Sequence, residues 1–154
     1  MKLSTKSRYG LRAIFDIAYN SGSLPAQVQD ISRRQGISPR YLEQIFQGLK
    51  RAGILKSKRG PQGGYCLAKK PEEITVADVL LATERDINLV ECTSKRKKKT
   101  ECNFDGTCVT QELWCEAGAK LLDFFSGFTV KDLCDRGQQM GVKREQDHRF
   151  MYFI

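Results

Sequence analysis

Three cysteines in one short polar stretch are the residues of this 154-residue chain best suited to bind a metal. Cys92, Cys102 and Cys108 lie in the segment CTSKRKKKTECNFDGTC, separated by nine and then by five residues. Zinc fingers and ribbons need close cysteine pairs with about two to four residues between them, and this segment has none. Iron–sulfur clusters are also bound by thiolates, so such a cluster is a candidate. The spacing alone is equally consistent with ordinary thiols in a solvated loop.

The expected cellular compartment bears on whether these thiols form disulfides. The first residues, MKLSTKSRYGLRAIF, have neither the apolar segment nor the small-residue cleavage site of a secretory signal. No apolar stretch approaches the roughly 20 residues that span a bilayer. We therefore expect a cytoplasmic protein with no membrane partner. In that reducing compartment the six cysteines favour metal binding or redox chemistry over a disulfide framework.

The basic run from Lys95 to Lys99 lies between the first two of these cysteines and has two interpretations. A block of like charges is typical of a solvated loop. Alternatively, its cations would lower the pKa of nearby thiols and offset the negative charge of a thiolate-bound cluster. Contact with DNA phosphate is a further role for the run.

The positive charge of the chain is concentrated in its amino-terminal half. Residues 1–70 contain fourteen Lys and Arg and three acidic residues, whereas residues 71–154 contain twelve and fifteen. A basic half is typical of nucleic-acid-binding proteins, because neutralising phosphates releases condensed counterions. Charge alone would also fit binding to a ribosome or to an anionic membrane surface.

Apolar residues at helical spacing predict three helices in the basic half. The first spans about residues 5–20, and a short second helix lies within residues 26–35 and is stopped by Gly36. The third begins with Ser38 as its N-cap, followed by Pro39 at the first helical position, where a missing N–H costs nothing.

A hairpin and three further helices follow. Two strands, at residues 54–58 and 64–68, flank the glycine-rich segment RGPQGG. Helices are then expected from Thr75, over residues 109–126, and over residues 129–137. The fold class is therefore mainly α with a small β wing, a winged helix-turn-helix plus a long C-terminal dimerisation helix.

The third predicted helix has the two faces that a DNA-reading helix needs, one apolar and one polar. Its polar face consists of Arg40, Glu43, Gln44, Gln47 and Arg51. Arg suits guanine, Gln suits adenine and Glu suits the amino group of cytosine. Any surface helix carries such residues, but the preceding short helix and the following basic hairpin favour DNA binding. The first strand of that hairpin carries Lys56, Lys58 and Arg59.

Long stretches of the chain resemble one family. MKLSTKSRYGLRAIFDIA, ISRRQGISPRYLEQIFQGLKRAGILKSKRGPQGGYCLAK and ELW are similar to the Rrf-two family of bacterial winged-helix regulators, and most of all to its iron–sulfur cluster-sensing members. The resemblance implies a homodimeric transcription factor in which Glu43 and Gln44 contact bases and Arg59 enters the minor groove. The position of Arg40 holds a smaller residue in cluster-sensing relatives, so we expect a different operator preference.

The resemblance also implies that Cys92, Cys102 and Cys108 hold an iron–sulfur cluster. The cluster-sensing relatives have a histidine three residues after the last cysteine, where this chain has Gln111. The fourth ligand therefore stays open among Glu112, Gln111 and Cys115, or is absent. A [2Fe–2S] cluster needs four ligands and a [4Fe–4S] cluster can leave one iron open; we favour [2Fe–2S] slightly.

The helix over residues 109–126 is the natural dimer interface, unless it folds back on its own domain. Its interface residues are Trp114, Leu121, Leu122 and Phe125. A two-fold dimer would bind a pseudo-palindromic operator in double-stranded DNA. We divide the chain into a DNA-binding domain (1–84), a cluster-binding loop (85–108), a dimerisation unit with its following short helix (109–136) and a polar tail (137–154).

The predicted function is a DNA-binding transcription regulator, and not an enzyme, whose operator binding is controlled by the cluster. One alternative is a cluster-free regulator that responds through thiol chemistry or a partner protein. A remote alternative is a small iron–sulfur redox enzyme, for which the chain offers no nucleophile–base constellation and no cofactor fingerprint.

Overall fold

The computed structural model of the chain describes residues 3–84, 87, 89–93, 104 and 107–145. Its elements in chain order are α1 (Thr5–Asp16), the π-helix η1 (Ile17–Ser21), α2 (Val28–Gln35), α3 (Pro39–Arg51), β1 (Leu55–Lys58), β2 (Gly64–Leu67), the 3-10 helix η2 (Pro71–Glu73), α4 (Val76–Thr83), the 3-10 helix η3 (Glu91–Thr93), α5 (Val109–Ser126) and α6 (Val130–Gln139). This order confirms the predicted fold class, mainly helical with one small antiparallel sheet.

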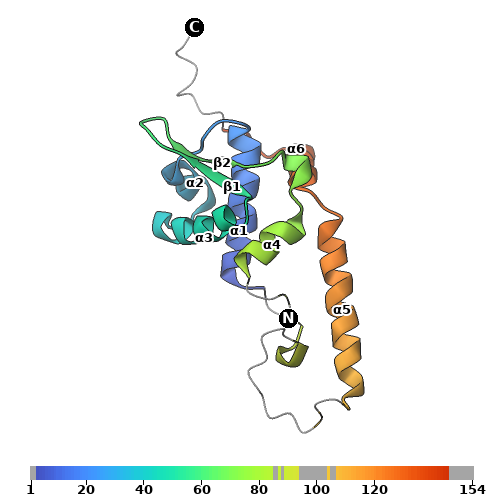
Figure 1. Cartoon of the computed structure of the whole chain (residues 1–154). Helices are drawn as coiled ribbons and strands as arrows, with labels where there is room; N and C mark the ends of the chain where they lie inside the picture. The colour runs from blue at the N-terminus through green and yellow to red at the C-terminus, as the bar shows by residue number, and fades with distance from the viewer. Residues whose placement is uncertain (1–2, 85–86, 88, 94–103, 105–106, 146–154) are drawn as a thin grey trace.

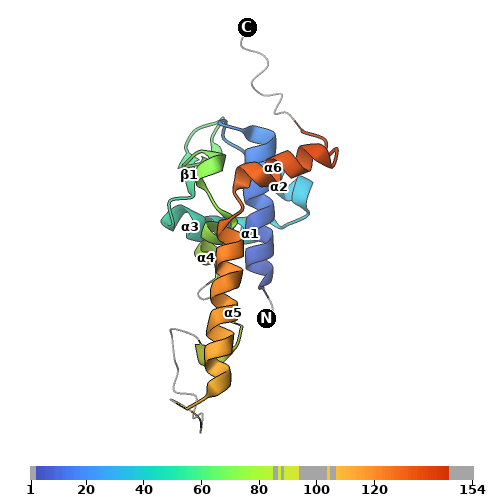
Figure 2. The same cartoon turned by 90° about the vertical axis from the view of Figure 1, so that its right-hand side faces the viewer.

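Helix α1 runs through the middle of the molecule, and the elements predicted to bind DNA lie on one side of it (Figure 1). Helices α2 and α3 and the hairpin lie to its left, whereas α4, α5 and α6 lie to its right. Figure 2 shows that the amino-terminal part of α5 extends away from the winged-helix elements and lies beside η3. No helix within the described ranges is long and apolar enough to cross a bilayer.

The apolar faces of the first four α-helices meet in one core. Ile14 of α1, Ile31 of α2, Ile45 of α3 and Val79 of α4 are each completely buried. Phe46 also reaches the wing, because its ring lies 4.6 Å from that of Tyr65. Burying these faces stabilises the arrangement in proportion to the apolar area removed from water.

Helix α6 returns to this core although it follows α5 in the chain. A short antiparallel bridge joins Thr75 to Thr129, and the Val130 amide donates to the Ile74 carbonyl at 2.9 Å. Val130 is completely buried and Cys134 nearly so. The core of the winged helix is therefore completed by a helix from the far end of the chain.

Several predicted boundaries needed adjustment. The first helix changes to a π-helix at Ile17, β1 begins one residue later than predicted, and β2 ends one residue earlier. Helix α6 continues to Gln139, whereas α5 has the predicted bounds. Residues 142–145, assigned to a polar tail, lie against the winged helix, where Val142 accepts a 2.7 Å hydrogen bond from the Tyr19 hydroxyl.

Candidate functional site

Helix α3 is held by its cap and by its buried face. The Ser38 hydroxyl accepts a hydrogen bond from the Tyr41 amide at 3.3 Å, and Pro39 occupies the first turn, as the sequence predicts. One face of the helix has no exposed surface at all; it consists of Leu42, Ile45, Phe46 and Leu49. Because this face is fixed in the core, the opposite face must point outward.

The outward face of α3 carries the five predicted DNA-reading side chains. All five are exposed: Arg40, Glu43, Gln44, Gln47 and Arg51. Arg51 also makes a hydrogen bond within α3, since its Nε donates to the Gln47 carbonyl at 3.3 Å. An α-helix fits the major groove of B-DNA, so this face has the size and chemistry to contact base edges there.

Two contacts from α1 fix the turn that leads into α3. Gly36 ends α2 in the left-handed region, at φ 64°, which glycine adopts without strain. Arg12 of α1 donates to the side-chain oxygen of Gln35 at 3.2 Å and also to the Gln35 carbonyl. The ring of Tyr9 meets that of Tyr41 edge-on, at 6.0 Å between centroids. Helix α1 therefore positions both helices of the helix-turn-helix.

The wing is a short hairpin with a basic outer edge. Lys56 pairs with Cys66 and Lys58 with Gly64, and the two lysines are exposed. Arg59 was predicted on the first strand; it lies one residue beyond β1, because the pairing ends at Lys58. Arg59 is thus an exposed residue at the start of the tip.

The wing is tied to α3 and to the segment just before α2. Lys50 of α3 donates to the Ser57 hydroxyl of β1 at 2.9 Å. On the other side, Ala26 and Tyr65 exchange two backbone hydrogen bonds of 2.8 Å. Gly64 permits this close pairing, since a Cβ at that position would lie 2.2 Å from the Ala26 carbonyl oxygen. These contacts hold the hairpin and α3 together as one unit, the predicted reading unit.

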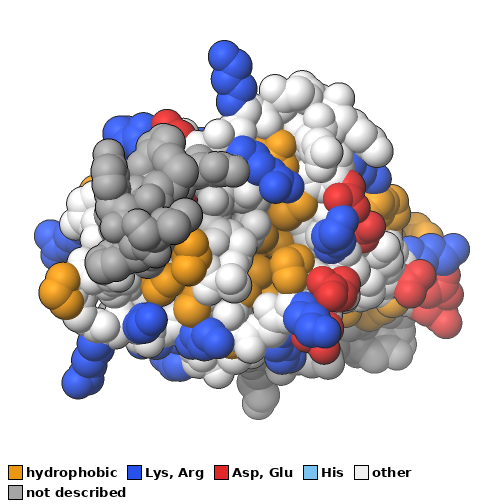
Figure 3. All heavy atoms as spheres, turned by 90° about the horizontal axis from the view of Figure 1, so that it is seen from above, with side chains coloured by type: hydrophobic (Ala, Val, Ile, Leu, Met, Phe, Trp, Pro, Cys, Tyr) orange, Lys and Arg blue, Asp and Glu red, His pale blue; other side chains and the backbone are white. Residues whose placement is uncertain are grey.

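Charge is unevenly distributed over this surface. In the view from above, Asp and Glu gather mostly on the right, the side of α5 and α6 (Figure 3). Lys and Arg are found on both sides, including the left, where α2, α3 and the hairpin lie. The side with the reading helix and the wing is thus the side suited to a polyanion.

The structure brings two of the three predicted cysteine ligands to one place. Cys92 lies in η3, which packs against α5, and Cys108 is the N-cap residue of α5. The side-chain amide of Gln111 donates to the Cys92 carbonyl at 3.4 Å. Cys102 and the run from Lys95 to Lys99 lie outside the described residues.

Cys108 lies in an environment that stabilises a thiolate. Its sulfur lies 3.2 Å from the Thr110 hydroxyl, and this contact and the backbone amides of Gln111 and Thr110 lower the pKa of the thiol. Amides at a helix N-terminus favour negative charge. Because iron is bound by thiolates, Cys108 fits as a cluster ligand, and Cys92 lies in the short helix that packs against α5.

The fourth ligand is not identified by geometry. Glu112 and Cys115 are exposed on α5, and the Gln111 amide is bonded to Cys92. Within the described residues, which omit Cys102, no three His, Cys, Asp or Glu side chains gather as a metal site. Cys66 and Cys134 are buried elsewhere, and burial raises the pKa of the Cys134 thiol.

Comparison with known proteins places the chain in a family. Residues 3–136 match the family model described as Rrf2, iron-dependent transcriptional regulator. The chain belongs to the Rrf2 family. It is therefore a helix-turn-helix transcriptional regulator, and the resemblance seen in its sequence is confirmed.

Individual Rrf2 regulators match over nearly the whole chain. The HTH-type transcriptional regulator IscR of Photorhabdus laumondii is 35% identical over 148 residues, covering 96% of this chain and 88% of the relative. The T. potens IscR structure has a TM-score of 0.73 and 31% identity, covering 99% of this chain and 97% of that chain. The structure of CymR, the global cysteine regulator of B. subtilis, has a TM-score of 0.70 and 31% identity, covering 88% and 98%.

Helix α5 of this Rrf2 protein is the one α-helix of the described residues whose side chains are all at least partly exposed. None of its residues is buried. Of the predicted interface residues, Trp114 is 40% exposed, and Leu121, Leu122 and Phe125 are partly exposed. The structure adds three exposed apolar side chains that the prediction omitted: Val109, Leu113 and Phe124.

The sequence reasoning missed the residues that position the reading unit. Arg12, Lys50 and Ala26 act through contacts between segments, and no local pattern marks them. For α5, the sequence did carry a signal. Leu113 and Phe124 lie beside the predicted apolar stripe of the helix, so a prediction with a wider stripe would have included them.

Proposed function

We propose that this Rrf2 regulator is a homodimer that binds a specific pseudo-palindromic operator through α3 and the wing. The observation that carries the proposal is the exposed polar face of α3, fixed by a fully buried opposite face and joined to a basic hairpin. Gln44 and Glu43 would contact base edges, and Arg59 would enter the minor groove. Lys56 and Lys58 would bind phosphate.

The base-reading role is tested by Gln44→Ala on an operator selected from random double-stranded DNA. Losing a base contact of about 1–3 kcal/mol should weaken operator binding about 5- to 150-fold and leave binding to random DNA little changed. Gln138→Ala, at an exposed position of α6, is the matched control. Equal operator affinities for the Gln44→Ala variant and the unmodified protein would contradict the proposal.

The phosphate role predicts a different pattern. Lys58→Ala should weaken binding to all sequences alike and reduce the slope of log affinity against log salt by about 1. A loss of affinity confined to the selected operator would instead mean that Lys58 reads bases.

We also propose that Cys92, Cys102 and Cys108 hold an iron–sulfur cluster that controls DNA binding, with the fourth ligand among Glu112, Gln111 and Cys115. Two features support it: Gln111 holds Cys92 at the start of α5, and Cys108 caps that helix. A bound cluster would supply a group whose presence and oxidation state follow iron supply and redox conditions.

Anaerobic purification tests the cluster directly. Iron and sulfide analysis with Mössbauer spectroscopy should find a cluster and distinguish [2Fe–2S], which we favour, from [4Fe–4S]. Cys92→Ala should abolish it, whereas Cys66→Ala, a buried position in the wing, should retain it. Among the fourth-ligand candidates, only the substitution that removes the true ligand should change the spectrum. A colourless, iron-free protein would contradict the proposal.

The control of DNA binding follows from where these residues lie. Holding Cys92 and Cys108 together fixes the start of α5, and α5 packs against α4 beside the reading unit. In a dimer built on α5, this would set the spacing of the two copies of α3. Cys92→Ala protein without cluster should therefore differ from the cluster-loaded protein in operator affinity. Unchanged affinity for every selected operator would contradict the switch.

A cluster-free thiol regulator is the second candidate, and the Cys108 environment favours it. A thiol of lowered pKa is the reactive kind, so oxidation of Cys108 would change the start of α5. A colourless protein whose operator affinity falls with peroxide, but not in Cys108→Ser, would support this candidate. In either case we propose that the protein acts in the cytoplasm and catalyses no reaction.

A further inference from the structure

The end of α4 is held against the first turn of α1 by a partly buried carboxylate. Glu84, the C-cap residue of α4, accepts a hydrogen bond from the Ser4 amide at 2.8 Å, and the same oxygen accepts one from the Ser7 hydroxyl. The Thr83 hydroxyl donates to the Ser7 oxygen at 3.2 Å. Ser7 is completely buried, and Thr83 is buried beside it. These side chains therefore form a polar cluster that joins the first and the fourth α-helix.

The Glu84 carboxylate carries its charge in this cluster. Partial burial alone would raise the pKa of this carboxyl, but hydrogen bonds from Ser4 and Ser7 and the charge of Lys6 outweigh it, so the pKa lies below its ordinary value. Hydrogen bonds to a charged acceptor are stronger than those between neutral groups. A buried donor that loses its acceptor is costly as well. Loss of the Glu84 side chain would therefore loosen the junction of the two helices.

The same turn of α4 also packs closely against α1 and α3. A Cβ at Gly10 of α1 would lie 2.8 Å from the methyl carbon of Thr83 and 3.4 Å from the Cγ2 of Ile45 in α3. A Cβ at Gly48 of α3 would lie 2.9 Å from the Ala82 carbonyl oxygen. The three helices thus meet here without room for another methyl group. Close-packed elements transmit displacements to one another, so α3 follows this turn.

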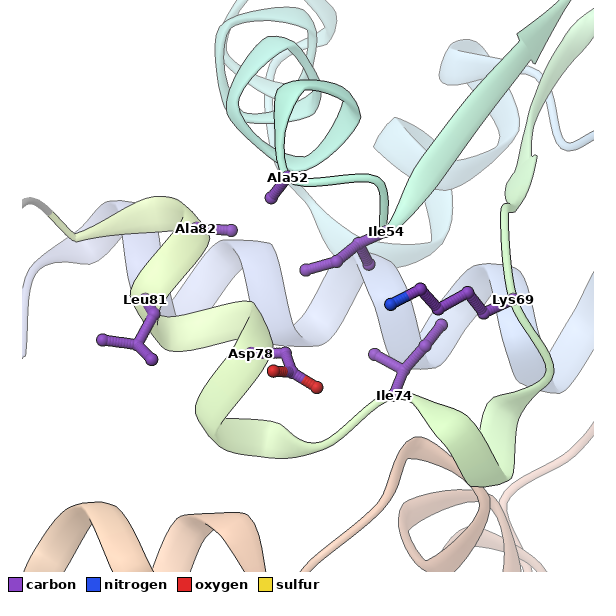
Figure 4. Close-up of a pocket in the computed structure, with 7 residues that line it drawn as sticks. All are labelled: Ala52, Ile54, Lys69, Ile74, Asp78, Leu81 and Ala82. Atoms are coloured by element: carbon purple, nitrogen blue, oxygen red, sulfur yellow. The ribbon is translucent and has the colours of Figure 1, made fainter.

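The space beside this contact is open. A hollow of about 250 Å³ lies between the end of α3, the base of the wing and α4 (Figure 4). Ala82 lines it, and so do Lys69, just after β2, and Asp78, in the first turn of α4. On this side, a shift of α4 toward the wing would meet little packed material. The position of its last turn therefore depends on the contacts that Glu84 makes with α1.

We propose that Glu84 is a positioning residue for DNA reading. The inference rests on the proposed reading of an operator by α3. Gly48, which the last turn of α4 touches, directly follows the reading residue Gln47. Ile45, the other α3 residue at this junction, directly follows Gln44. By holding the end of α4 against α1, Glu84 fixes from the buried side of α3 the backbone that carries both reading side chains.

Operator binding by full-length Glu84→Ala tests the proposal, on an operator that the unmodified protein selects from random double-stranded DNA. Removing a negative charge should by itself strengthen binding to DNA slightly, because DNA is a polyanion. Loss of positioning should instead weaken operator binding roughly 2- to 30-fold, the range of mutations that act through packed networks, and leave binding to random DNA no weaker. The amide oxygen of Glu84→Gln can accept the same two hydrogen bonds, so this variant should bind the operator as the unmodified protein does.

Glu72→Ala, which removes an exposed carboxylate of η2, is the matched control and should bind the operator at least as tightly as the unmodified protein. Circular dichroism checks that each variant is folded. Ser7→Ala removes one of the two donors and should weaken operator binding by a smaller factor; it carries the test if Glu84→Ala does not fold.

Two results would overturn this inference alone: equal operator affinities for Glu84→Ala and Glu72→Ala, or equal losses for Glu84→Ala and Glu84→Gln. If Glu84→Ala does not fold, unchanged operator binding by Ser7→Ala would overturn it. An unmodified protein that selects no operator would overturn the proposed DNA reading and this inference with it.

Discussion

The winged helix and α5 bury their apolar side chains very differently. In α3, four large side chains of one face have no exposed surface, whereas α5, a longer helix, has no buried residue. Contiguous exposed apolar patches mark interaction sites. The exposed apolar side chains of α5 therefore indicate a surface that a partner covers. The contrast supports the proposed dimer, in which a second copy would cover α5, whereas the proposed reading unit needs only one chain.

The largest expected effect comes from opening the winged-helix core. Phe46→Ala should cost about 4 kcal/mol of unfolding free energy, because it removes a fully buried ring that also contacts Tyr65. Urea unfolding measures it. The matched change on α5 is Phe124→Ala, which removes a ring that is 59% exposed in the single chain. Its effect on the free energy of unfolding should instead vary with protein concentration, because a dimer contact is lost. A loss below 1 kcal/mol for Phe46→Ala would contradict the contrast.

A buried ion pair gives the next effect. Asp16 is completely buried, and its carboxylate accepts hydrogen bonds from Arg34 at 2.6 Å and from Gln35 at 2.8 Å. Asp16→Ala should cost about 3 kcal/mol, because Arg34 is left mostly buried without its partner.

Two further variants sharpen the test of this pair. The double variant Asp16→Leu with Arg34→Met should recover much of the loss, since it removes both charges. Asp135→Ala, which breaks an exposed pair with Lys131, should change urea unfolding little. If the Asp16 and Asp135 variants were equally stable, burial would not be the deciding factor.

The α5 side of the comparison predicts a change in assembly. Leu113→Glu, at a position 58% exposed in the single chain, would place a charge in the dimer interface. The dimer dissociation constant should rise about 30-fold, equivalent to about 2 kcal/mol. Sedimentation equilibrium measures it, and Met140→Glu, at the exposed apolar residue that follows the last residue of α6, is the control. A protein that is monomeric without any substitution would refute the interface.

The smallest effect concerns the segment that follows α6. Hydrogen bonds and charge from Arg33 and Arg34 lower the pKa of Glu145 to about 2, from an ordinary value of 4.5. The stabilisation is therefore present above about pH 4.5 and is lost as the pH falls toward 2. Glu145→Gln should lower the urea midpoint slightly at pH 6 and leave it unchanged at pH 2. An equal decrease at both values would mean that charge is not involved.

Local patterns in the sequence predicted most of the fold. Ser38 and Pro39 mark the start of α3, and Gly36 marks the end of α2, because caps and left-handed residues depend on neighbours in the chain. The apolar spacing gave the bounds of α5. The return of α6 to the core was not predicted, since its bridge joins Thr75 to Thr129 across the sequence.

The candidate sites divide in the same way. The outward residues of α3, such as Gln44, followed from helical periodicity. The contact of Gln111 with Cys92 did not, because it spans a segment without regular spacing. The hollow that Lys69 and Asp78 line, between the base of the wing and α4, was likewise not predicted (Figure 4). The two residues come together only when the wing and α4 pack against each other.

The sequence by itself determined the family and the fold class, and it predicted the polar face of α3 and the three candidate cysteine ligands. Each of these depends on residue types at fixed spacing along one segment. Only the tertiary structure decided that α1 positions the helix-turn-helix, that Cys92 lies at the start of α5, and that α5 stays uncovered. These properties depend on which surfaces meet in space, and burial and hydrogen bonding between distant segments are set only by packing.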